Sequence, residues 1–135
     1  MHKFRDCYSE EIIDTQGRLF ELMSCEDIDF CAFITDYMNS NIRKQIDGRN
    51  PILCNYLAPD LLKEFKKECK LKKGKGFDFM LANWVGEFYA TLQDYSGVSS
   101  RVIIKRFPAE SILRRCGGLH DYDMGLVMKK ILETN

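Results

Sequence analysis

Apolar residues recur at helical spacing over residues 77–95, the clearest pattern in the chain. The positions on this face are Phe77, Met80, Leu81, Trp84, Val85, Phe88, Leu92 and Tyr95. Steps of three and four residues return to the same side of an α-helix, so this segment is predicted to be helical. It holds the only tryptophan and is expected to lie at the centre of the fold. Gly86 and Ala90 lie off the apolar face and are small enough to let a second helix approach closely.

A second helix is predicted to begin at Pro59, because proline is favoured in the first turn. Its expected buried face consists of Ala58, Leu61, Leu62, Phe65 and Cys69. Lysines cover the opposite face, and Gly74 is expected to end the helix.

Two further helices are predicted before these. One covers residues 10–23, with Gly17 as a weak point, and the next is capped by Ser24 and ends near Asp47. The apolar stretch over residues 52–57 favours neither helix nor strand.

The C-terminal third predicts three short helices. The first follows Ser99 or Ser100 and covers residues 101–107, and the second runs from Pro108 to the glycines at 117–118. The last covers residues 121–132, with Leu126, Val127 and Ile131 directed inward. The β-branched residues 102–104 also suit a strand, but a lone strand has no partner for its hydrogen bonds, so helix is favoured. The chain is therefore predicted to be an all-α bundle of about five to seven helices, with residues 1–135 forming one domain.

The composition indicates a globular protein. Apolar residues make up 45% of the chain and charged residues 30%, with 20 basic and 20 acidic side chains. The zero formal charge excludes a whole-domain electrostatic footprint for nucleic acid or an anionic membrane, although a local basic patch stays open. There is no apolar run long enough for a transmembrane helix and no signal-peptide pattern at the N-terminus. The six cysteines form no C-x-x-C pair, so we expect reduced thiols and a cytoplasmic protein.

The segment from Leu92 to Ile103 resembles the helix-turn-helix of DNA-binding proteins. Gly97 permits the turn, and four polar residues would then face the DNA groove: Ser99, Ser100, Arg101 and Lys105. Two positions depart from the motif, since Gln93 stands where a small residue is expected and Arg106 where an aliphatic one is expected. The alternative is an ordinary helical corner capped by serine.

Two other features suggest chemistry. The lysines between Lys66 and Lys75 suit phosphate contact or an acidic protein partner, but their spacing is not that of a P-loop and a solvated helix end is favoured. Cys116 and His120 place a thiol near an imidazole, and Asp121 or Asp123 would complete a catalytic set. The intervening glycines suit a helix end better, so we predict no catalytic residue, no metal and no cofactor.

Two longer segments carry a family resemblance. Residues 33–47 read F-I-T-D-Y-M-N-S-N-I-R-K-Q-I-D, and residues 84–89 read W-V-G-E-F-Y, followed by Ser99-Ser100 and Leu119-His120-Asp121-Tyr122-Asp123. The chain resembles, over roughly Phe20 to Ile131, a group of small bacterial helical proteins of unknown activity. Their genes tend to lie beside genes for putative ADP-ribosyltransferase-like toxins. The resemblance implies an antitoxin or accessory role, by association rather than mechanism.

We therefore expect a non-enzymatic protein-binding module, antitoxin-like, whose partner is the putative toxin encoded nearby. Its binding surface is expected to present exposed aromatics such as Tyr37, Tyr95 or Tyr122. The alternative is a DNA-binding regulator that uses the corner at Gly97, and a third hypothesis is an enzyme that uses Cys116 and His120. The sequence sets neither the identity of the partner nor the oligomeric state.

Overall fold

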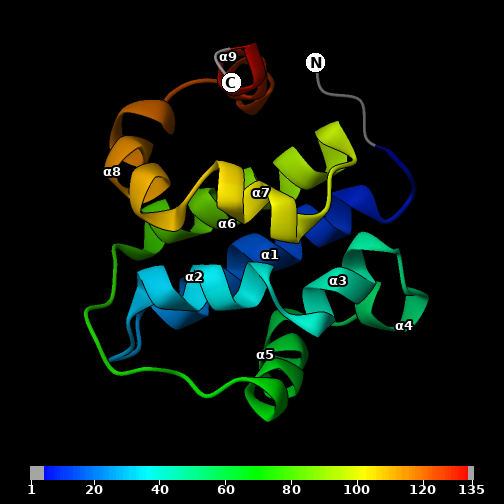
Figure 1. The fold of residues 1–135 in the computed structure, drawn as a ribbon, viewed down its shortest axis with the longest axis vertical. Coiled ribbons are helices and arrows are strands. Elements are labelled where there is room, and N and C mark those ends of the chain that lie inside the picture. The colour runs from blue at the N-terminus through cyan, green and yellow to red at the C-terminus, as the bar shows by residue number, and fades with distance from the viewer. Residues whose placement is uncertain (1–4, 134–135) are drawn as a thin grey trace.

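The structure, a computed structural model, describes residues 5–133 and is built from helices packed around one core (Figure 1). In chain order these are α1 (Ser9–Ser24), α2 (Phe30–Met38), α3 (Asn41–Asp47), α4 (Pro51–Cys54), α5 (Ala58–Glu68), α6 (Phe79–Ser96), α7 (Ser100–Arg106), α8 (Ala109–Leu119) and α9 (Met124–Glu133). The described part contains no strand, and its only β-type pairing is an isolated bridge between Ile28 and Lys73. The all-α class is confirmed.

The predicted number of helices was too low, since residues 5–133 form nine rather than five to seven. One cause is a break in the helix that was predicted to run from Ser24 to near Asp47. Ser40 accepts a hydrogen bond from the backbone N–H of Arg43 (3.0 Å) and so starts α3 as a separate helix. Asp29 caps α2 in the same way through Ala32 N (3.0 Å), whereas Ser24, the predicted cap, belongs to the last turn of α1.

The end of α5 was also predicted wrongly, because the helix stops at Glu68 and not at Gly74. The segment after Glu68 is not helical, and the start of α2 is hydrogen-bonded to it. The backbone N–H of Asp29 donates to Lys72 O (2.8 Å) and that of Phe30 donates to Lys75 O (3.3 Å). A tertiary contact therefore ends the helix six residues before the glycine.

Two predictions for the C-terminal third need correction. Helix α8 continues through Gly117 and Gly118 to Leu119, so these glycines do not end it. Leu126 is 47% exposed rather than directed inward, whereas Val127 and Ile131 are buried as predicted. Helix α7 confirms the helical state of residues 102–104, and Ser99 caps it.

The largest helix–helix contact in the described chain joins α1 to α6. A Cβ atom added to Gly86 would lie 2.5 Å from the carbonyl oxygen of Gln16 and 2.9 Å from the Cα of Gly17. The two backbones therefore touch where each helix has a glycine, and Gln16 Nε2 donates to Gly86 O (2.9 Å). Gly86 allows the close helix approach that was predicted for it. Gly17, which was expected to weaken the first helix, is part of the contact with α6.

Aromatic side chains fill the core beside this crossing. Phe20, Phe33, Tyr37 and Phe65 form a chain of ring contacts with centroids 5.4–6.1 Å apart. Tyr37 is 1% exposed, so it is not the exposed aromatic that the sequence suggested. Tyr95 and Tyr122 are exposed, at 46% and 49%.

None of the helices between residues 5 and 133 has the length and apolar character needed to cross a membrane.

The glycine crossing predicts the effect of two alanine substitutions. Gly86→Ala forces apart two backbones that have no flexible side chain to yield, so we expect a loss of stability of about 1–3 kcal/mol. The control is Gly118→Ala, whose added methyl group meets no atom within 4 Å. That change should stabilise the protein by about 0.5–1 kcal/mol through helix propensity. Urea unfolding followed by circular dichroism measures both, and a neutral Gly86→Ala would contradict the crossing.

Candidate protein-binding surface

A group of exposed apolar side chains lies between α4 and α5, in the first half of the chain. Ile52 is 66% exposed and Leu57 is 68% exposed, and the partly buried Leu53 and Tyr56 lie between them in the sequence. We call these four residues the α4–α5 corner. Large apolar side chains at this exposure cost free energy in water, and their grouping is typical of a binding surface.

Local capping holds this corner in place. The side chain of Asn50 accepts hydrogen bonds from Ile52 N (2.9 Å) and Leu53 N (3.3 Å), and Pro51 occupies the first position of α4. Leu57 then adopts an extended backbone and α5 begins at Ala58. The short helix and the turn after it fix where the apolar side chains emerge.

A groove of about 750 Å³ separates the corner from α1. Its wall includes Ile13 and Thr15 from α1, and Tyr56 and Leu57 from the corner. The charged side chains that line it are carboxylates: Glu10, Glu11, Asp14 and Glu87. The groove therefore combines an apolar side with an acidic one.

Only one of these carboxylates has an ion pair within residues 5–133, namely Asp14 with Arg18 (3.2 Å). Burial raises the pKa of Glu87 above its ordinary value of 4.5, and the nearby Asp14 and Glu21 raise it further. Glu10, Glu11 and Glu87 therefore line the groove without an ion-pair partner among the described residues.

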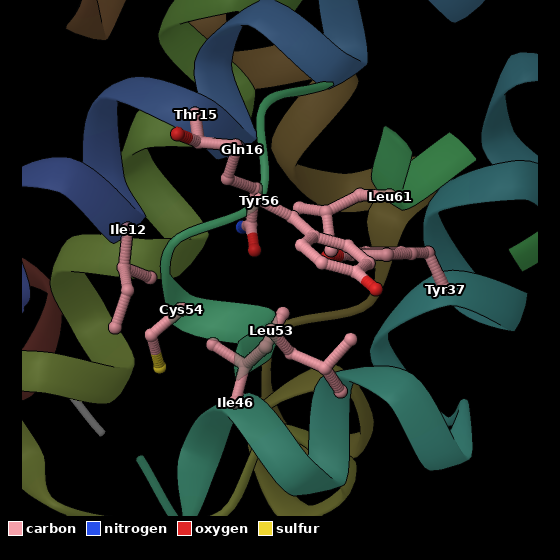
Figure 2. A pocket seen from close by; sticks show the side chains of 9 residues that line it. All are labelled: Ile12, Thr15, Gln16, Tyr37, Ile46, Leu53, Cys54, Tyr56 and Leu61. Atoms are coloured by element: carbon pink, nitrogen blue, oxygen red, sulfur yellow. The ribbon is translucent and has the colours of Figure 1, made fainter. Parts of the chain in front are cut away.

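A small pocket lies next to the groove and shares Thr15, Cys54 and Tyr56 with it (Figure 2). It leaves about 10 Å³ for a water-sized group. Gln16 reaches into this space, and its Oε1 atom is buried without a hydrogen-bond donor. Tyr37 also lines the pocket, and burial raises the pKa of its phenol to about 12, so it stays protonated at neutral pH.

The predicted DNA-contact residues lie at the turn between α6 and α7, and they differ in exposure. Gly97 has a positive φ of 70°, as the turn requires. Ser99, Arg101 and Lys105 are exposed, but Ser99 caps α7 through Val102 N and Arg101 donates from Nε to Asn39 O (3.0 Å). Ser100 is 0% exposed and binds Asp47 through both its N–H (2.8 Å) and its hydroxyl (2.6 Å). Its side chain is therefore part of the α3–α7 contact and is not presented to solvent.

A network of charges joins this turn to the N-terminal segment. Arg49, with φ of 60°, lies 2.8 Å from Asp6 and 3.0 Å from Asp94, which is 3% exposed. Arg49 also donates to Gln93 Oε1 (3.1 Å), and Gln93 in turn donates to Val98 O (3.3 Å). Gln93, which departs from the helix-turn-helix pattern, thus stabilises the turn by hydrogen bonds instead of by small size.

The structure does not bring Cys116 and His120 into a catalytic arrangement. His120 Nδ1 lies 2.9 Å from Gly117 O, and Nε2 lies 3.4 Å from Asp121. Cys116 is buried, its thiol donates to Leu113 O (3.3 Å), and burial raises its pKa, the opposite of an activated nucleophile. Among the described residues, no three potential ligands from His, Cys, Asp and Glu gather closely enough to hold a metal ion.

The lysine-rich segment is exposed along the second half of α5 and the open chain after it. Lys66, Lys67, Lys70, Lys72, Lys73 and Lys75 are all exposed. In Figure 1 the chain after α5 runs away from the start of α1, and none of these lysines lines the acidic groove, although Lys67 lines a separate hollow at Tyr56.

Sequence reasoning missed the α4–α5 corner and the groove beside it. The apolar residues 52–57 are typical of core, and no periodic pattern over so short a stretch separates a buried side chain from an exposed one. The useful signal was the capping sequence Asn50-Pro51, which marks a helix start directly before Ile52.

Replacement of Glu87 tests the electrostatics of the groove. A carboxyl with a raised folded-state pKa stabilises the fold when protonated, and that stability is lost as the pH rises through the folded pKa. Glu87→Gln should therefore raise the urea midpoint at pH 7, and the gain should shrink as the pH falls through the raised folded pKa and be lost below 4.5. The control is Glu26→Gln at an exposed position, where we expect no change. An equal response of the two variants would contradict the assignment.

No protein-family model, no curated protein and no solved structure matches the chain.

Proposed function

We propose that the chain is a non-enzymatic protein-binding module, an antitoxin-like or accessory protein whose partner is encoded in the same operon. The observation that carries this proposal is the α4–α5 corner, where Ile52 and Leu57 are about two-thirds exposed and Leu57 lines a groove. Apolar anchors surrounded by polar side chains are the usual centre of a protein interface. The resemblance of residues 33–47 and 84–89 to proteins encoded beside putative toxins supports the choice of partner.

The corner is surrounded by charges suited to an interface rim. Asp60, Lys63, Glu64 and Lys67 line a shallow hollow at Tyr56, on the side of the corner away from α1. Exposed charged residues around an apolar centre contribute specificity and association rate more than affinity. The exposed Tyr95 lies on α6 and the exposed Tyr122 in the turn between α8 and α9, so they are secondary candidates for contact.

Co-expression with the neighbouring operon gene tests this proposal. The tagged protein should co-purify with that gene product in fixed stoichiometry and should suppress its toxicity. Ile52→Asp combined with Leu57→Asp should weaken binding at least about thirtyfold, since a buried anchor contributes about 2 kcal/mol or more. Continued cell killing with no co-purifying product would rule the proposal out.

The matched control replaces two apolar residues of similar kind elsewhere on the surface. Leu22 and Leu126 are 41% and 47% exposed and lie on α1 and α9. Leu22→Asp combined with Leu126→Asp should leave co-purification unchanged. Circular dichroism of both double variants verifies that neither has unfolded.

A second candidate function is DNA binding by the corner between α6 and α7. It is favoured by one observation, namely that Arg101, Lys105 and Arg106 are all exposed on α7. Because α7 has seven residues and Ser100 is engaged by Asp47, the surface left for base contacts is small. The two functions are compatible, since an antitoxin can also repress its own operon.

A gel shift with the operon's promoter tests the second candidate. Binding should weaken steeply between 50 and 200 mM salt, because contacts to phosphates release counterions. Arg101→Ala combined with Lys105→Ala should abolish the shift, and Arg114→Ala combined with Arg115→Ala on α8 is the control. No shift at low salt, or a shift that both pairs of variants retain, would exclude the corner.

A further inference from the structure

The groove between α1 and the α4–α5 corner has a chemistry that specifies what it binds. We propose that it takes a segment of the protein partner that carries lysine or arginine side chains together with large apolar ones. This inference rests on the proposed function, and it adds the chemical character of the partner's contact segment.

The charge of the groove is the first argument. Glu10 and Glu11 lie in the first turn of α1, and Glu87 of α6 lines the same groove, near Asp14. No lysine or arginine lines the groove, and within residues 5–133 none of these three carboxylates has an ion pair. A cationic segment therefore relieves repulsion inside the groove as well as gaining attraction, and an anionic one meets like charge.

The apolar wall is the second argument. Tyr56, Leu57 and Ile13 line the same groove as the carboxylates, and Leu57 is 68% exposed. A volume of about 750 Å³ accommodates several side chains, not a single ion. Burial of Leu57 needs an apolar partner surface. A polycation without apolar residues would pair with the carboxylates of the groove but would leave Leu57 exposed to water.

An unpaired buried acceptor is the third argument. Gln16 is 2% exposed, and its Nε2 is already bonded to Gly86 O (2.9 Å), so Oε1 is the atom that faces the pocket. That pocket shares Thr15, Cys54 and Tyr56 with the groove and has room for one water-sized group (Figure 2). A buried acceptor without a donor is costly, so a donor group next to Tyr56 is stabilised here. The groove and the pocket both present acceptors that have no donor in the described chain.

A second copy of this chain is the other occupant with matching charge, through its lysine-rich segment after α5. No residue of that segment lines the groove of its own molecule, so such a contact would join copies head to tail. Head-to-tail contacts build longer assemblies as the protein concentration rises. A partner segment in the groove would not, so self-association distinguishes the two occupants. We commit to the protein partner because the lysine-rich segment offers Leu71 as its only large apolar residue between Lys66 and Lys75.

A defined peptide tests the groove independently of any partner. The probe is an octapeptide of alternating leucine and lysine pairs, titrated into the ¹⁵N-labelled protein, and its charge-reversed analogue carries glutamate in place of lysine. With the lysine peptide we expect saturable shifts of the amide signals of residues 10–15 and 54–57 and of the Gln16 side-chain amide. The glutamate peptide should produce none. Shifts scattered over the surface, or an equal response to both peptides, would overturn the proposal.

Variants that replace carboxylates of the groove by neutral amides test whether the lysine peptide binds in the groove. Glu10→Gln combined with Glu11→Gln should raise the Kd of the lysine peptide about tenfold. Glu26→Gln combined with Asp27→Asn, two exposed acidic residues just after the other end of α1, should not change it. An equal loss in both pairs would show a general charge effect and would overturn the assignment.

Sedimentation velocity over a range of protein concentrations completes the test. A monomer at all concentrations supports the partner segment, whereas self-association that Glu10→Gln and Glu11→Gln abolish would assign the groove to a second copy.

Failure of this inference is distinguishable from failure of the proposed function. If an operon product co-purifies but the lysine peptide does not perturb the groove, the protein-binding function stands and this inference is wrong. If the peptide binds the groove but no product co-purifies, the proposed function is the part that fails.

Discussion

The direct contact between the backbones of α1 and α6 is the constraint on which the rest of the fold depends. A side chain on Gly86 would overlap the carbonyl of Gln16, and a Cβ on Gly17 would press against the side chains of Glu87 and Asn83. Because the helices lie so close, Gln16 reaches Gly86 O, and Glu87, which lines the groove, lies against Gly17. The position of the groove relative to the core is thus set by two residues that have no side chains.

Buried acidic residues then attach the smaller helices to this pair. Asp47 accepts two hydrogen bonds from Ser100 and lies 3.2 Å from Arg43, whose guanidinium is fully buried and has no aligned hydrogen bond of its own. Its charge offsets the cost of burying Arg43. Asp94 acts similarly on α6, where it binds Arg49 and Ser9. Several residues of the family-like segments, Ser40, Asp47, Gly86 and Ser100 among them, therefore have structural roles in this molecule.

The sequence predicted the elements whose signals are local and missed those decided by distant contacts. The periodicity of residues 77–95 located α6, and Pro59 located the start of α5, because both signals lie within the helix itself. The end of α5 depends on hydrogen bonds from Asp29 and Phe30, which no local pattern contains. The groove depends on the approach of α1 to the α4–α5 corner, and neither Glu10 nor Leu57 indicates by its sequence neighbours that the two line one groove.

The separation of the lysine-rich segment from the acidic groove has a consequence for how the molecule meets other molecules. Its formal charge is zero, yet the groove is lined by carboxylates without a lysine or arginine, whereas the segment after α5 carries exposed lysines. A charged molecule that approaches is attracted by one of these surfaces and repelled by the other, even when there is no net attraction. Orientation during diffusion, and hence the rate of productive encounter, will depend on ionic strength although the isoelectric point lies near neutrality.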